Sequence, residues 1–114
     1  MLKQIFINTN TKQWLNLEQF PGTKIMPLAK PVSQGSIHRL QMAAGTVIPI
    51  HSHPCDEYVY VLKGTIETGG RQCEQGSFWF TPANTQNGLH KAITDVELLT
   101  LRLGAMGVFE EIEM

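Results

Sequence analysis

The sequence has little cysteine, almost no net charge and no long apolar run, and each shortage excludes a class of function. Its two cysteines, Cys55 and Cys73, form no C-x-x-C pair, so we expect neither a redox motif nor a cysteine-ligated zinc cluster. We expect both thiols to stay reduced, because a chain of 114 residues buries enough surface to fold without a disulfide. A formal net charge of −1 offers no basic field that would hold nucleic acid or an anionic membrane.

Targeting and nucleotide-binding signals are also missing. No apolar run approaches the roughly 20 residues of a membrane span, and the first residues, Met1 to Phe6, lack the apolar region and cleavage site of a secretion signal. We therefore expect a cytoplasmic protein without a membrane or nucleic-acid partner. The chain contains no G-x-S-x-G elbow, no P-loop and no G-x-G-x-x-G motif, which argues against serine-nucleophile and nucleotide-dependent enzymes.

Turn-forming residues, in contrast, are frequent. With 10 glycines and 6 prolines, the chain is divided into short runs rich in β-branched, aromatic and leucine residues. The clearest of these runs are Ser36–Met42, Tyr58–Leu62, Ser77–Thr81 and Val96–Leu103. Many short runs separated by turn signals predict an all-β sandwich or barrel. The pair Gly69-Gly70 predicts a hairpin turn, whereas Thr11–Phe20 has too few periodic positions to predict a helix.

Two histidines and a glutamate stand close together in His51-Ser52-His53 and Glu57. On an extended strand, residues i and i+2 point to the same face, so both imidazoles can approach one ion. If the run that Glu57 opens pairs beside this segment, the carboxylate reaches the same point, and His90 can add a third imidazole. Histidines plus a carboxylate bind iron, manganese or zinc in many proteins. By itself, however, an H-x-H pair also fits ordinary hydrogen-bonded or surface histidines, and Glu57 a solvated charge.

The residues around this pair carry a family resemblance. The pattern Gly45-(x5)-His51-x-His53-(x3)-Glu57-(x6)-Gly64 matches the first motif of the cupin superfamily without a gap. The resemblance implies a single-domain cupin β-barrel, a double-stranded β-helix of jelly-roll type. It also implies one divalent transition metal per chain.

The second cupin motif is matched less well. Gly76-(x5)-Pro82 fits its opening, but Asn84 stands where the family usually has glycine, and Asn87 where it usually has histidine. Asparagine tolerates the left-handed backbone that glycine adopts, so the first departure is mild. Either the loop up to Leu89 is longer here and His90 is the fourth ligand, or Asn87 takes that place. We favour His90, because Asn87-Gly88 is a good turn pair and imidazole is the better ligand for a transition metal.

A wider and less specific resemblance covers nearly the whole chain. Residues Trp14, Pro21-Gly22, Lys24, Leu28, Gly35, Arg39-Leu40 and Ile48-Pro49 look like the N-terminal half of the ChrR-like cupins. This group includes the metal-binding domain of cupin anti-sigma factors and is similar to small dioxygenases of diketones and hydroxyacetophenones. The resemblance implies one domain over 1–114, with N-terminal strands in 1–35, a metal-binding barrel core in 36–103 and a short tail in 104–114. It implies a homodimer and the metal ligands His51, His53, Glu57 and His90.

Three neutral imidazoles and one carboxylate leave a divalent ion with a net charge of about +1 and open positions for other ligands. We therefore expect a metal-dependent, dioxygenase-type enzyme that acts on a small enolisable or phenolic ketone. A non-catalytic domain that senses a metal and a small ligand is the alternative, and an isomerase or epimerase of a small carbonyl compound is a third possibility. The ligand set suits Fe, Mn, Ni, Cu and Zn alike, so the metal stays open.

Several residues near the motif allow two interpretations. Alternation from Glu57 sends Val59 and Val61 into the barrel, and Tyr58 and Tyr60 outward, where they suit a dimer interface or an ordinary surface.

His38 lies on a separate run from the motif. It is either a hydrogen-bonded structural histidine or a group just behind the ligands that helps in proton transfer. Arg39 and Arg102 are most simply ion-paired or solvated arginines, although either can steer an anionic substrate.

Overall fold

The computed structural model describes residues 4–30 and 32–104. Within these ranges one 3₁₀ turn, η1 (Thr9–Thr11), precedes a series of strands. The strands are β1 (Leu15–Asn16), β2 (Thr23–Pro27), β3 (Ser36–Met42), β4 (Val47–Ile48), β5 (Asp56–Lys63), β6 (Ile66–Thr68), β7 (Arg71–Cys73), β8 (Phe78–Thr81), β9 (His90–Ala92) and β10 (Val96–Leu103). The predicted all-β fold is therefore confirmed.

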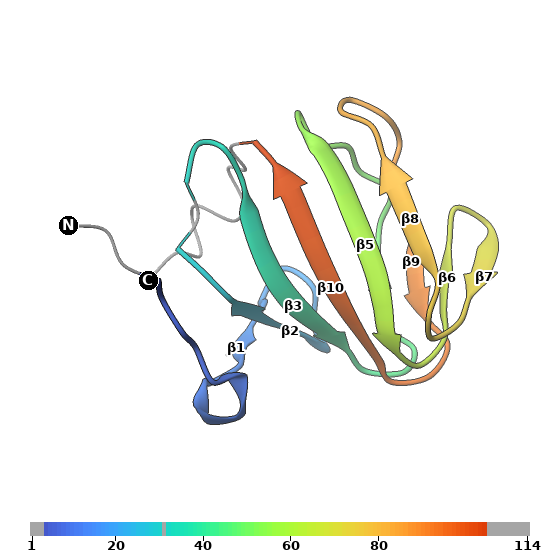
Figure 1. Cartoon of the computed structure of the whole chain (residues 1–114). Helices are drawn as coiled ribbons and strands as arrows, with labels where there is room; N and C mark the ends of the chain where they lie inside the picture. The colour runs from blue at the N-terminus through green and yellow to red at the C-terminus, as the bar shows by residue number, and fades with distance from the viewer. Residues whose placement is uncertain (1–3, 31, 105–114) are drawn as a thin grey trace.

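The strands form two antiparallel sheets that pack against each other (Figure 1). The larger sheet has the order β1-β2-β3-β10-β5-β8, and the smaller sheet has the order β4-β9-β6-β7. Each sheet also joins strands that are distant in sequence, as in β3 beside β10 and β4 beside β9, which is the connectivity of a jelly roll. One core cluster joins the sheets, with Val61 and Leu98 from the larger sheet and Ile66 and Ala92 from the smaller.

The runs predicted from the sequence correspond closely to these strands. Ser36–Met42 and Val96–Leu103 coincide with β3 and β10, and the other two runs overlap β5 and β8. Gly69-Gly70 connects β6 to β7, which pair antiparallel, so the predicted hairpin is confirmed. The strictly alternating burial along β3 shows why this pattern is readable, since every second side chain enters the core.

Burial along β5 alternates from Glu57 onward, as the sequence predicted. Glu57, Val59 and Val61 are buried, whereas Tyr60 is exposed and Tyr58 is half-buried on the opposite face. The face of the larger sheet that carries Glu57, Val59 and Val61 thus points toward the smaller sheet, and the face that carries the tyrosines points outward. This orientation places the Glu57 carboxylate inside the barrel.

The turn after β5 requires glycine. Gly64 has a φ of +85°, in the left-handed region, and an added Cβ would clash with the backbone carbonyl of Asp95. Gly64 is the last residue of the first sequence motif. The motif therefore includes, besides the histidines, a turn at which two chain segments come close together.

Four smaller expectations concern the rest of the chain. The segment from Thr11 to Phe20 contains β1 and no α-helix. Cys55 is buried and Cys73 lies on β7, and the two do not form a disulfide. No helix within residues 4–30 and 32–104 is long and apolar enough to cross a membrane. Of the predicted tail over 104–114, all but Gly104 lies outside the described residues.

Candidate metal centre

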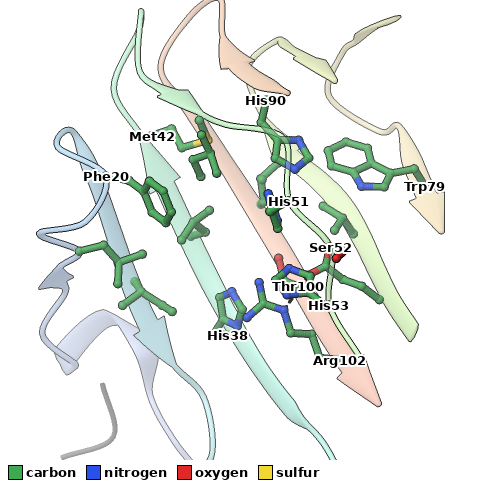
Figure 2. A pocket seen from close by; sticks show the side chains of 17 residues that line it. Phe20, His38, Met42, His51, Ser52, His53, Trp79, His90, Thr100 and Arg102 are labelled. Atoms are coloured by element: carbon green, nitrogen blue, oxygen red, sulfur yellow. Dashed lines mark hydrogen bonds and ion pairs between the residues drawn. The ribbon is translucent and has the colours of Figure 1, made fainter. Parts of the chain in front are cut away.

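A cavity of about 220 Å³ lies between the two sheets (Figure 2). Its apolar wall includes Leu17, Phe20, Ile25, Leu40, Met42 and Trp79. Its polar wall includes His38, His51, His53, Glu57, His90 and Arg102. All four predicted ligands and the predicted neighbour His38 therefore face the same cavity.

The segment that carries His51 and His53 is extended, but it does not pair with β5. Strand β5 pairs with β10 and β8 instead, so the pairing considered as one route for Glu57 does not form, and the carboxylate reaches the cavity from β5 without it. The histidine segment is held by the loop before β9: the backbones of His51 and Asn87 exchange hydrogen bonds at 3.0 and 2.7 Å. The N–H of Asn84 also donates to the carbonyl oxygen of His53 at 2.7 Å.

The same loop delivers His90 to the cavity. Asn84 has a φ of 61°, so asparagine does supply the left-handed residue that the family pattern assigns to glycine. His90 then opens β9, opposite Ile48 of β4 and Thr68 of β6. The amide of Asn87 contacts the carboxylate of the site instead, with its Nδ2 donating to Glu57 Oε1 at 2.7 Å. His90, three residues after Asn87, thus places an imidazole beside the ring of His51.

The three imidazoles are close together and two of them are oriented by hydrogen bonds. The ring centres of His51 and His53 are 4.6 Å apart, and those of His51 and His90 are 5.5 Å apart. The Nδ1–H of His51 donates to the carbonyl oxygen of Pro49 at 2.8 Å, and His90 Nδ1 shares a hydrogen bond with Thr68 Oγ1 at 2.7 Å. When Nδ1 is engaged in this way, Nε2 is the nitrogen left for a metal ion.

His53 shows a different feature that fits a ligand. Its Nε2 is buried and has no hydrogen-bond partner, and it lies 3.7 Å from Glu57 Oε2. A buried nitrogen without a partner is costly unless something else satisfies it. As the side chains are placed, no group of three or more His, Cys, Asp or Glu within residues 4–30 and 32–104 has ligating geometry. The donor set nevertheless fits, because two ligands of one ion at metal–nitrogen distances of about 2.0–2.1 Å have ring centres roughly 5 Å apart.

Glu57 is a buried carboxylate with two strong partners. Oε1 accepts from Asn87, and Oε2 accepts from Arg102 Nε at 2.6 Å. Burial raises the pKa of this carboxyl, but the Arg102 charge and hydrogen bond, with smaller contributions from His53 and Asn87, outweigh burial and hold the pKa below 4.5. Glu57 is therefore ionised at neutral pH, with lone pairs beyond those that the two donors use.

Two of the proposed ligands, His53 and His90, are neutral at physiological pH. Burial, and then the charge of Arg102, lower the pKa of His53 to about 4. Burial, and then the neighbouring His51, lower the pKa of His90 to about 4. Only the neutral form of imidazole binds a metal ion, so the surroundings keep these two rings in the ligating form.

His38 and the two arginines have distinct environments. His38 is buried on β3, and burial followed by the Arg102 charge lowers its pKa well below 6.5. Arg39 lies on the outer face, where its Nε donates to Glu97 Oε2 at 2.6 Å and its guanidinium covers the Trp14 ring. Arg102 lies on the cavity wall and pairs with Glu57. Both arginines are therefore ion-paired, but only Arg102 belongs to the site.

Two residues beside His90 complete the site. Trp79 stacks on His90 with ring centres 6.0 Å apart, and Thr68 holds the same ring from β6. Nothing in the sequence singles out Thr68, because its role depends on the pairing of β6 with β9. Arg102 was named from the sequence, and its place between Leu101 and Leu103, both exposed, puts it on the inward face of its strand.

A jelly-roll barrel with histidines and an ionised glutamate facing one cavity is the architecture of a cupin. A family model described as the ChrR cupin-like domain matches residues 2–107. The chain therefore belongs to the ChrR-like cupin family, and the resemblance inferred from its motifs is confirmed.

Solved structures agree on the fold. KdgF from Halomonas sp. shares 22% identity at a TM-score of 0.78, covering 93% of this chain and 97% of that chain. An RmlC-like cupin from Shewanella frigidimarina shares 17% identity at a TM-score of 0.81, covering 94% and 96%. An acetylacetone dioxygenase from Acinetobacter johnsonii shares 17% identity at a TM-score of 0.74, covering 91% and 75%. No curated protein matches the chain.

Proposed function

We propose that this chain is a metal-dependent enzyme of the dioxygenase type that acts on a small enolisable or phenolic ketone. The observation that carries the proposal is the group of three neighbouring imidazoles, two with Nδ1 engaged and one with a buried, unpartnered Nε2, on the wall of a largely apolar cavity. The likeness to an acetylacetone dioxygenase supports the reaction class, although at this identity it establishes only the fold.

In this proposal His51, His53 and His90 hold one divalent metal ion, and Glu57 is the fourth ligand. A bound divalent ion supplies a Lewis acid for the ketone oxygen and, when it is iron, a place for dioxygen. The Arg102 and Asn87 donors fix the Glu57 carboxylate and keep it ionised, while Pro49 and Thr68 orient two of the rings. We propose that His38 lies behind the ligands as a neutral hydrogen-bonding group.

The remaining cavity wall determines what can enter. Phe20, Leu40 and Met42 present apolar surface that excludes water around a bound ketone. A cavity of about 220 Å³ is below the roughly 300–1,000 Å³ of sites for drug-sized ligands, so the substrate is small. Apolar walls beside fixed polar groups hold a ketone with its oxygen toward the imidazoles.

The first experiment is elemental analysis of protein purified without a tag or chelator. It is followed by oxygen uptake after anaerobic Fe(II) loading, with a small panel of diketones and hydroxyphenyl ketones. Iron near one per chain with substrate-dependent oxygen uptake supports the proposal. Loaded protein that consumes no oxygen with any panel member contradicts it.

The second candidate is a non-catalytic domain that binds a metal and a small ligand. The family match favours this candidate, because the family is described as the ChrR cupin-like domain and resembles the metal-binding domain of cupin anti-sigma factors. In this case the same histidines hold zinc tightly, and the ligand binds without turnover. Zinc that survives dialysis against a chelator, together with no oxygen uptake, would favour this candidate.

A further inference from the structure

The cavity contains a cation that a neutral ketone does not need. Arg102 lies on β10 with its side chain on the cavity wall, and its charge lowers the pKa of both His38 and His53. Its Nε donates to Glu57, and Figure 2 shows the outer end of its guanidinium beside His38. A guanidinium is a planar fork of N–H donors that matches a carboxylate.

The Arg102–Glu57 pair changes the charge of the proposed centre. With three neutral imidazoles and Glu57 alone, a divalent ion would leave the site at about +1. Arg102 offsets the carboxylate, so the same site stands at about +2. In a cavity with apolar walls this excess charge favours an anionic ligand over a neutral one of equal shape.

The contacts also place the anion relative to the carbonyl group. Arg102 Nε is 2.6 Å and His53 Nε2 is 3.7 Å from the same oxygen, Glu57 Oε2. Arg102 is therefore separated from the proposed ligand His53 by a single carboxylate oxygen. A ligand that reaches both must carry its negative group a few bonds from its ketone.

We propose that the substrate of this cavity is a small keto acid whose carboxylate pairs with Arg102 while its ketone faces the imidazoles. Its apolar remainder lies against Phe20, Leu40 and Met42. This inference rests on the function proposed above, because it uses the same cavity, and it names the substrate class more narrowly.

Three ligands with the same arrangement of non-hydrogen atoms test the inference. Acetoacetate carries the carboxylate, acetoacetamide replaces it with a neutral amide, and acetylacetone replaces it with a methyl ketone. Their affinities are measured by titration calorimetry on zinc-loaded protein, which does not turn over, and again on metal-free protein. We expect acetoacetate to bind about tenfold or more tightly than acetoacetamide, the value of a charge-assisted hydrogen bond.

The variant Arg102→Gln should reduce this preference about tenfold. Arg39→Gln is the matched control, because Arg39 is also paired with a glutamate but lies on the outer face. Equal preference in the wild type and Arg102→Gln, or an equal loss in Arg39→Gln, overturns the inference. If Arg102→Gln fails to fold, the Nε–H resonance of Arg102 in wild-type protein replaces it. This resonance should shift with acetoacetate and not with acetoacetamide, and the absence of that difference is equally contrary.

The two proposals fail separately in this design. Oxygen uptake by iron-loaded protein, with acetoacetate added to the ketone panel, tests the dioxygenase function, whereas the preference for acid over amide is a binding ratio that needs no turnover. A large ratio without oxygen uptake contradicts the function alone. Uptake with acetylacetone and a ratio near one contradicts the keto-acid inference alone.

Discussion

A histidine that binds a metal ion usually has its other ring nitrogen held by a hydrogen bond. Thr68 plays that part for His90, so Thr68→Val should weaken metal binding about 10- to 100-fold, the cost reported for such outer partners. Zinc affinity by competition with a chromogenic chelator measures the change. Thr23→Val is the matched control, because Thr23 is also buried but its hydroxyl has no hydrogen-bond partner. Equal affinity in the two variants would contradict the role of Thr68.

Alanine substitutions separate the proposed ligands from their neighbours. His51→Ala, His53→Ala, Glu57→Ala and His90→Ala should each sharply reduce bound metal, since each removes a donor atom. His38→Ala should keep its metal, because His38 is not a donor to the ion. Asn87→Ala should weaken metal binding as Thr68→Val does without abolishing it, because its amide only holds the Glu57 carboxylate. Metal content by elemental analysis is the measurement. Full metal in His90→Ala with loss in Asn87→Ala would reverse the assignment of the fourth ligand.

The buried His38 should make the protein less stable in acid. Its pKa in the folded state is lowered, so below pH 6.5 the unfolded chain binds a proton that the folded chain does not. The free energy of unfolding therefore decreases as the pH decreases. His38→Asn should remove this part of the slope, which is at most about 1.4 kcal/mol per pH unit. Urea unfolding of chelator-treated protein between pH 5 and 8 measures the slope. Parallel slopes for variant and wild type would show that His38 does not contribute.

At the scale of single elements, the turn after β5 combines backbone strain with a close contact. Gly45 and Gly64 have similar φ values of +87° and +85°, but nothing lies within 4 Å of an added Cβ at Gly45. Gly45→Ala should therefore cost only the left-handed backbone, about 1–2 kcal/mol. Gly64→Ala should cost about 1–3 kcal/mol more, because its Cβ meets the Asp95 carbonyl. Urea unfolding compares the two, and equal losses would contradict the contact.

The elements also show what the sequence could predict. Turn residues on either side located β3 and β10, whose alternating pattern reflects one buried face, and the spacing of the first motif located three residues of the site. Pairing between distant segments was not readable. The hydrogen bonds between His51 and Asn87, and the ion pair of Glu57 with Arg102, depend on which strands become neighbours. Local sequence patterns do not indicate which strands become neighbours, because the pairing and its register are set by the assembled core.

At the scale of the whole molecule, the outer face of the larger sheet is unusually apolar. Rows of side chains run across β10, β5 and β8: Leu101, Tyr58 and Phe80 in one row, and Leu99, Tyr60 and Phe78 in the next. The Tyr58 ring stacks on Phe80 and on Phe78, with centres 5.0 and 6.1 Å apart. Phe78 is 58% exposed and Phe80 is 46% exposed, so this aromatic face remains open to solvent in one chain. Large apolar patches of this kind mark interaction sites.

We expect this aromatic face to join two copies of the chain in the homodimer that the family resemblance implies. Phe78→Glu should give a monomer, because a buried carboxylate without a partner opposes association. Ile93→Glu is the control, since Ile93 is 45% exposed but lies outside the larger sheet. Sedimentation velocity should find dimers for the wild type and Ile93→Glu and monomers for Phe78→Glu, with unchanged circular dichroism. A monomeric wild type, or dimers in all three proteins, would mean that the aromatic face does not pair two chains.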